Sequence, residues 1–197
     1  MRLTILLLAA AAVLPSRSIA QVPVFEITPV ESKIRFDVKA SVALTGVFDK
    51  WDASLRFTSA DVETGVLEVK IQAGSVNAGS GMKEGKLKGK DFFDAEHSPL
   101  ITFVSKKIVP TGPDQYRLEG DFTIRGVSKP EILMLTIVRE GDGVGRIQGQ
   151  MAFDRKDYGM TKNIPFMKIA DRVQVDVSLK ARRISGPPVT VKIKSGD

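Results

Sequence analysis

Apolar and polar residues alternate in one segment after another along most of this chain. Strict alternation is typical of a β-strand that turns one face to a core and the other to water. Such segments are found at residues 34–38, 51–57, 67–71, 116–124, 147–153 and 173–179, and residues 101–108 and 131–138 are more continuously apolar. Eight or nine strands in succession, with no helices between them, predict an all-β antiparallel barrel or sandwich.

One stretch breaks this rhythm. Residues 82–94 show no period of two, and we predict a short helical insertion there, weakened by glycines at positions 81, 85 and 89. After Lys180 the chain turns at Pro187-Pro188, and Val189, Val191 and Ile193 either add an edge strand or stay unpaired. We therefore expect one domain over residues 21–184 and a C-terminal tail over residues 185–197.

The N-terminus has the pattern of a signal peptide. Arg2 precedes an apolar run from Leu3 to Leu14, and Ser18-Ile19-Ala20 places small residues before a cut. Twelve residues are too few to span a bilayer, which needs roughly 20. We expect cleavage after Ala20, with residues 1–20 as signal peptide, and a soluble protein exported to a bacterial periplasm.

The charge and the absence of cysteine limit the function further. The formal charge is +6, and it falls by two when Arg2 and Arg17 leave with the signal peptide. An excess of this size favours solubility and permits attraction to anionic lipid head groups, but it does not predict a nucleic-acid partner. With no cysteine in the chain, stability must come from one core rather than from disulfides.

Four lysines lie close together just before the aromatic pair Phe92-Phe93: Lys83, Lys86, Lys88 and Lys90. A phosphate loop is excluded, because the glycine spacing is wrong and Leu87 stands where a hydroxyl is required. Single-strand nucleic-acid binders interleave aromatic residues with their cations, which this stretch does not. A solvated loop and the polar mouth of an apolar pocket both remain open.

Candidates for catalysis and for metal binding are few. His97 is the sole histidine and there is no cysteine, so a transition-metal site and histidine-dependent nucleophilic catalysis are both improbable. We expect His97 to be exposed or to lie at a rim. Asp121, Asp154 and Asp157 could supply carboxylates for acid–base work, but turns and solvated strand faces explain them better. No catalytic residue and no cofactor are predicted.

Aromatic residues recur on the alternating segments. They are expected to line the interior, which an eight-stranded barrel can either fill or leave open for a ligand. They are Phe36, Phe48, Trp51, Phe57, Phe103 and Phe122.

Four stretches resemble the YceI-like family of exported, lipocalin-like proteins associated with polyisoprenoid binding. In order they are FEITPVESKIRFDVKA with the following GVFDKW, KDFFDAEHSPLITF, GDFTIRGVSKPEIL, and FDRKDYGM. Together they cover nearly the whole chain after residue 24. The resemblance implies an eight-stranded antiparallel barrel around an elongated apolar cavity, with a helical lid region between strands.

The resemblance also implies a ligand site. An isoprenoid tail would lie in the cavity and a polar or phosphorylated head near its mouth. The head group is expected to contact Lys83, Lys86, Lys88 and Arg155. The tail is expected to contact Phe36, Phe48, Trp51, Phe92, Phe103, Phe122 and Met160. The family's Arg-Asp pair, His and Arg before D-F-F-D are replaced here by Lys83-Glu84, Lys86 and Lys88, and a second histidine by Lys39. These departures keep the charge but lose the bidentate arginine fork, so they bear on head-group preference.

The first hypothesis is therefore a non-enzymatic periplasmic carrier of a polyisoprenoid or similar long amphipathic lipid, with no nucleic-acid partner. The alternative is a ligand-free stress or membrane-interaction protein whose barrel is filled by side chains and whose lysines touch a membrane surface or a membrane protein transiently. An enzyme acting on such a lipid is a third hypothesis, and the missing nucleophile–base pair weighs against it. The sequence does not select an oligomeric state, a head group or a chain length.

Overall fold

The computed structural model describes residues 21–41, 44–164 and 168–191, so the predicted signal peptide lies outside it. The strands of the described residues are β1 (Val24–Ala40), β2 (Leu44–Phe48), β3 (Trp51–Arg56), β4 (Val66–Gln72), β5 (Val76–Asn77), β6 (Leu100–Gly112), β7 (Gln115–Ile124), β8 (Val127–Gly141), β9 (Val144–Asp154) and β10 (Ile169–Ser185). The helical elements are α1 (Gly81–Lys88) and the 3-10 turns η1 (Val62–Thr64), η2 (Ala73–Ser75) and η3 (Arg155–Tyr158).

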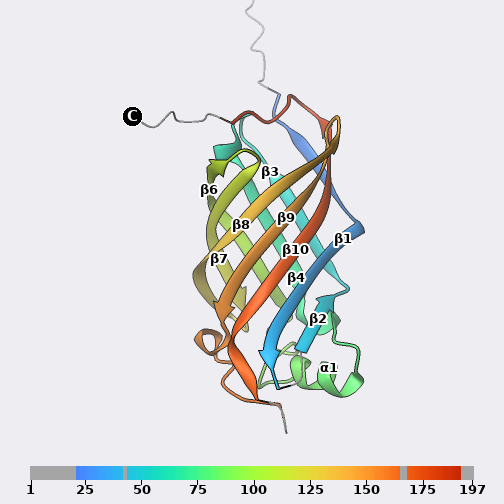
Figure 1. Ribbon diagram of the computed structural model, residues 1–197, viewed down its shortest axis with the longest axis vertical. Coiled ribbons are helices and arrows are strands. Elements are labelled where there is room, and N and C mark those ends of the chain that lie inside the picture. Colours follow the sequence, from blue (N-terminus) through green and yellow to red (C-terminus); the bar gives the residue numbers. More distant parts are fainter. Residues whose placement is uncertain (1–20, 42–43, 165–167, 192–197) are drawn as a thin grey trace, which may run out of the picture.

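These strands join in one antiparallel sheet, in the order β3-β4-β6-β7-β8-β9-β10-β1-β2-β5. The sheet curls until β1 lies against β3, where the rings of Phe25 and Phe57 pack with centroids 5.8 Å apart. The strands from β3 to β1 form the wall of an elongated barrel (Figure 1). The predicted lipocalin-like barrel is confirmed. The sheet has ten strands in place of eight, because β2 and β5, of 5 and 2 residues, extend one edge.

The alternation read from the sequence is the inside–outside alternation of the wall. In β7 every second residue is buried, from Tyr116 to Ile124. In β10 the buried positions include Val173, Val177 and Leu179. The buried apolar side chains form a single core cluster inside the barrel. The hydrophobic pattern thus sets which face of each strand is inside, since a shift by one residue would expose the whole set.

Strand β1 is long because a bulge lets it bend along the barrel. Its pairing with β10 shifts between Thr28 and Lys33, and Glu31 has a positive φ of 63° there. The hydroxyl of Ser32 accepts a hydrogen bond from the Lys180 N–H (2.7 Å) and donates to the Thr28 carbonyl oxygen (2.5 Å). The side chain thus supplies the ladder bond that the bulge removes.

The end of the barrel that carries α1 is called the lower end, as drawn in Figure 1. The predicted helical insertion is present, but its α-helix ends at Lys88, because Gly89 leaves the helical conformation. The N–H of Phe93 then donates to the Leu87 carbonyl oxygen (2.9 Å), and Leu87, Phe92 and Phe93 are buried beneath. None of the helices in the described ranges is long and apolar enough to cross a membrane.

The opposite, upper end carries the β8–β9 turn and the C-terminal segment, defined as residues 187–191, which crosses this end of the barrel (Figure 1). The Thr190 N–H donates to the Ala60 carbonyl oxygen (2.7 Å), and the Val62 N–H donates to the Thr190 carbonyl oxygen (2.9 Å). Val189 and Val191 pack on the core. The predicted edge strand is therefore reduced to one parallel bridge, and Ile193 lies outside the described residues.

Candidate functional site

The described residues enclose a cavity at each end of the barrel, and of these two the larger lies at the upper end. Its volume is about 230 Å³. The β8–β9 turn and the C-terminal segment border it. Its apolar wall includes Leu55, Phe57, Leu67, Ile108, Leu118, Leu135, Ile137, Ile147, Ala181, Pro188, Val189 and Val191. This upper cavity is slightly smaller than the roughly 300–1,000 Å³ that ligand pockets usually have.

The lower cavity is about 60 Å³ and lies towards α1 and η3. Aromatic rings fill most of the space around it. Phe36, Phe48 and Phe93 pack with centroids 5.6–5.9 Å apart. Phe122, Phe153 and Tyr158 form a second trio at 5.0–5.5 Å. Such tilted and edge-on pairs stabilise the packing beyond the area they bury.

A layer of side chains, here called the waist, separates the two cavities. On β6, Phe103 lies between Ile101 of the lower cavity and Ile108 of the upper one. Its ring covers Gly120 of β7, where a Cβ atom would come within 2.9 Å of the ring. On β9, Met151 is buried between Ile147 and Phe153, the residues of that strand that line the upper and lower cavities. Phe103 and Met151 are therefore buried at the level between the two cavities.

Polar groups at the upper cavity gather near the β8–β9 turn. Arg139 donates to Asp114 (2.6 Å), and this guanidinium holds the pKa of the Asp114 carboxyl below its usual value. Burial, together with the Asp114 charge, raises the pKa of Tyr116, so its phenol stays protonated. Within the described part of the chain its hydroxyl makes no hydrogen bond. Arg183 is half-buried and lines the same cavity.

The residues predicted to contact a lipid tail divide between these features. Phe36, Phe48, Phe92, Phe122 and Met160 all line the lower cavity. Phe103 lines neither cavity, because its ring belongs to the waist. Trp51 lines neither cavity either; it begins β3, pairs with Ile71 and packs half-buried on the core.

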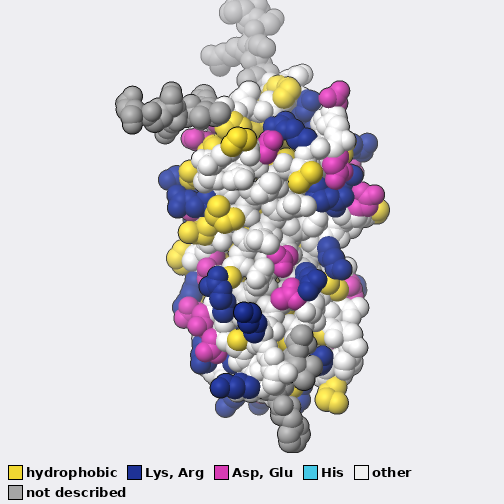
Figure 2. Space-filling model, viewed as in Figure 1, with side chains coloured by type: hydrophobic (Ala, Val, Ile, Leu, Met, Phe, Trp, Pro, Cys, Tyr) yellow, Lys and Arg dark blue, Asp and Glu magenta, His cyan; other side chains and the backbone are white. Residues whose placement is uncertain are grey.

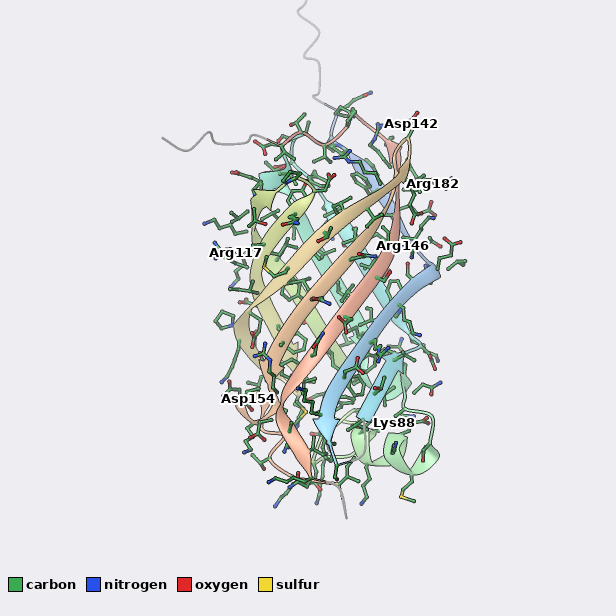
Figure 3. All side chains as sticks on the ribbon, viewed as in Figure 1. Lys88, Arg117, Asp142, Arg146, Asp154 and Arg182 are labelled. Atoms are coloured by element: carbon green, nitrogen blue, oxygen red, sulfur yellow. The ribbon has the colours of Figure 1, made fainter. Side chains whose placement is uncertain are left out.

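The lysines predicted to contact a head group all lie on α1, outside the lining of the two cavities. None of the lysines Lys83, Lys86 and Lys88 borders either cavity. Lys88 lies on α1 at the lower end, far from Asp142 and Arg182 at the upper end (Figure 3). On the face shown in Figure 2, Lys and Arg side chains are mixed with Asp and Glu rather than gathered in one patch. The head-group role of these lysines stays a prediction.

Arg155 does line the lower cavity, but its donors are occupied by protein. It donates to the carbonyl oxygens of Met160, Lys162 (2.7 Å), Ile169 (3.3 Å) and Ala170 (3.1 Å), and it lies 3.3 Å from the Asp171 carboxylate. The Arg155 side chain is only 4% exposed. Arg155 thus fastens the loop between β9 and β10 across the lower end and has no donor left for a head group.

The carboxylates considered for catalysis have structural partners. Asp154 caps η3 by accepting from the Lys156 N–H (2.8 Å), and Asp157 is 3.3 Å from the Lys129 ammonium. Asp121 pairs with Lys106 at 2.6 Å. His97 is exposed and contacts Asp94 at 2.9 Å, which raises the pKa of the imidazole.

No cluster of ligands suited to a metal ion occurs in residues 21–41, 44–164 and 168–191. The sequence reasoning missed Tyr116, Arg139 and Arg183 as site residues. Arg183 carries a local signal, since it continues the inward series of β10 after Leu179 and Ala181. The contact of Val189 with the cavity has no local signal, because it depends on pairing with residues about 130 positions earlier.

Comparisons with known proteins identify relatives. The model of the YceI-like domain matches residues 25–181. A UPF0312 protein of Shewanella denitrificans is 28% identical over 165 residues, 80% of this chain and 86% of the relative. One from Azotobacter vinelandii is 27% identical over 126 residues, 61% of this chain and 66% of the relative. The chain spans only 50% of the matched protein of Pseudomonas savastanoi.

Solved structures share the fold. BcnA of Burkholderia cenocepacia superposes with a TM-score of 0.71 at 27% identity, covering 79% of this chain and 99% of BcnA. The YCEI protein of Campylobacter jejuni has a TM-score of 0.59 at 28% identity, covering 71% and 85%. The family match extends over most of the chain, and the barrel agrees with the folds of these relatives. The chain belongs to the YceI-like family.

Proposed function

We propose that this protein is a periplasmic carrier that holds a polyisoprenoid or similar long amphipathic lipid inside its barrel. The observation that carries the proposal is the upper cavity, an apolar space of about 230 Å³ that the core leaves open. Burial of a lipid tail contributes roughly 0.8 kcal/mol per CH₂ group. A domain of Saccharophagus degradans with this fold binds polyisoprenoid and is implicated in plant cell wall breakdown. At 17% identity that likeness concerns the fold, so the ligand class is part of the proposal.

A long tail needs more room than either cavity has alone. The two cavities lie along one barrel axis with the waist between them, and a tail that passed Phe103 and Met151 would join them. Methionine adapts its shape readily, because its unbranched side chain has three rotatable bonds. We therefore propose that the tail enters the upper cavity and displaces waist side chains towards the lower one.

The alternative is a barrel without ligand that acts through its surface. The packing of the lower half favours it, because two trios of aromatic rings leave only about 60 Å³ there. In either case the proposed role is binding rather than catalysis, since Asp154 and Asp157 serve a helical cap and a surface ion pair.

The experiment that tests the carrier function is mass spectrometry of organic extracts. The mature protein is purified from a periplasm without detergent, alongside an Ala181→Phe variant that fills the upper cavity. The matched control is Thr136→Phe, which adds the same ring on the exposed face of β8. One isoprenoid species in stoichiometric amount, lost in the Ala181 variant and kept in the control, is the expected result. A wild-type protein that stays empty after incubation with polyprenyl phosphates and quinones would favour the ligand-free alternative.

A further inference from the structure

Arg183 is a cation inside the barrel mouth without an acidic partner. It lines the upper cavity, and its Nη1 atom donates to the Gly186 carbonyl oxygen at 2.6 Å. No carboxylate lies within 4 Å of its guanidinium in the described part of the chain. A half-buried guanidinium with one backbone contact leaves most of its five donors free. A cation in that state is suited to an anion that comes from outside the chain.

The neighbouring residue, Arg182, is an arginine with an acidic partner. Arg182 points away from the cavity on the outer face of β10, and it pairs with Glu26 at 2.8 Å. Its side chain is 64% exposed, so its charge is balanced and solvated. Two consecutive arginines on one strand therefore have opposite surroundings, and the inward one lacks the carboxylate that the outward one has.

Two more polar groups line the same cavity. The Tyr116 hydroxyl is a donor without a partner among the described residues. Arg139 adds a second guanidinium, already paired with Asp114 at 2.6 Å. The lining thus carries two arginines and one aspartate, an excess of one positive charge. Arginine binds carboxylates and phosphates through two parallel hydrogen bonds, which a lysine cannot do.

The C-terminal segment covers this mouth with few bonds. Among the described residues its hydrogen bonds to the rest of the barrel are those of Thr190, whose N–H, carbonyl and hydroxyl bond to Ala60 and Val62, and Val189 and Val191 add apolar packing on the core. Gly186 sets its direction with a positive φ of 77°, at a place where any Cβ would collide with the Val22 carbonyl oxygen. A short segment held this way opens at a small free-energy cost compared with the strands.

We propose that the upper mouth binds the anionic head group of the lipid, with Arg183 and the Tyr116 hydroxyl as its donors, and that the tail points down the barrel towards α1. This inference rests on the proposed function and adds to it the head-group class and the orientation. The ligand is an amphipathic lipid with a phosphate or carboxylate head. The lysines of α1 then lie at the opposite end from that head.

The test compares lipids that share a tail. Farnesyl phosphate and farnesol differ only in the head group, a phosphate in one and a hydroxyl in the other, and inorganic phosphate alone tests the head without the tail. Binding is measured by isothermal titration to the wild type, to Arg183→Gln, to the matched control Arg182→Gln, and to the triple variant with glutamine at positions 83, 86 and 88. Thermal unfolding of each variant confirms that it is folded.

The expected result is that wild type prefers farnesyl phosphate to farnesol, that Arg183→Gln lowers this preference about tenfold, and that the other two variants keep it. Farnesol affinity should stay the same in all four proteins. Loss of the preference in the lysine variant alone would overturn the inference and place the head at α1. Binding of inorganic phosphate as tight as farnesyl phosphate would also overturn it, because the ligand would then be a free anion. If no prenyl compound binds wild type, the carrier function itself fails.

Discussion

The two halves of the barrel are built from the same alternating strands, yet the lower half leaves only about 60 Å³ open and the upper half about 230 Å³. The difference lies in the size of the inward side chains. Towards α1 they include the phenylalanines at positions 36, 48, 92, 93, 122 and 153, whereas towards the β8–β9 turn they include Gly145 and Ala181. Strand geometry alone does not decide whether a barrel holds a ligand; the choice of inward residues does.

The arginines of the two halves differ in how many of their hydrogen-bond donors the protein itself occupies. At the lower end Arg155 donates to four backbone carbonyls. Arg125 joins Gly159 (2.6 Å) to Lys90 (2.9 Å) through its two terminal nitrogens, while its buried Nε has no partner among the described residues. These contacts fasten the turn after α1 and the loop after β9. At the upper end Arg183 makes one such contact. The arginines of the lower end therefore hold neighbouring segments together, whereas Arg183 at the upper end has donors that no group in the described part of the chain occupies.

The largest expected contrast comes from truncating one side chain in each half. Phe93→Ala removes a ring shared by a packed trio and should lower the free energy of unfolding by about 3–5 kcal/mol. Leu135 borders a space that is already open, so Leu135→Ala should lower the free energy of unfolding by only about 2 kcal/mol, the low end for such changes. Urea unfolding followed by the fluorescence of Trp51 measures both. Equal losses would mean that the upper cavity is as tightly packed as the lower half.

Arg155 gives the next largest effect. Arg155→Gln leaves several buried carbonyl oxygens without donors, each worth about 1–3 kcal/mol, so we expect a loss of about 3 kcal/mol or more in unfolding free energy. The control is Lys156→Gln, the next residue, whose exposed pair with Asp171 should be worth less than about 1 kcal/mol. Should the Arg155 variant be as stable as the control, the loop after β9 would not depend on this guanidinium.

The sequence predicted the strands of the barrel wall well, but it predicted the packing of the side chains inside the barrel only in part. Alternation located the strands, and it marked Phe36, Phe48 and Phe122 as interior, because inward position follows from a period of two. It could not tell that Phe103 closes the waist, since that depends on Gly120 in a neighbouring strand.

The candidate site was harder still to predict. A basic run such as the lysines of α1 is conspicuous in a sequence, whereas a single inward arginine is not. The free donors of Arg183 and the occupied donors of Arg155 differ through backbone contacts between segments, and no sequence pattern reports those contacts.

The C-terminal segment should change access more than stability. A chain ending at Gly186 loses the Thr190 bonds and the partly buried Val189 and Val191, at a cost of about 1–2 kcal/mol. We expect it to bind a hydrophobic dye and farnesyl phosphate faster than the full chain, by stopped-flow fluorescence. The full-length variant with aspartate at both 189 and 191 should show the same increase in association rate. Unchanged association rates in both would show that lipid does not enter at the upper end.

The smallest effect concerns the charge of His97 at the lower end. The carboxylate of Asp94, and then that of Glu96, raises the pKa of this imidazole above its ordinary value of about 6.5. A raised pKa means that the pair stabilises the fold below about pH 6.5 and that this contribution is lost as the pH rises through the folded-state pKa. Since His97 is the sole histidine, a proton NMR titration reads it directly, and Asp94→Asn should return its pKa towards the ordinary value.

The effect of salt can be compared between the charges at the two ends of the barrel. The His97–Asp94 pair is exposed to solvent, so 0.5 M sodium chloride should weaken the attraction between the two charges and reduce the pKa shift, while the hydrogen bond between them remains. A head group held by the half-buried Arg183 should be screened less, because the cavity wall excludes ions. The preference for farnesyl phosphate over farnesol should therefore persist in the same salt. If salt reduced that preference as much as it reduced the His97 shift, the head group would lie on the surface, where the lysines of α1 could reach it and Arg183 could not.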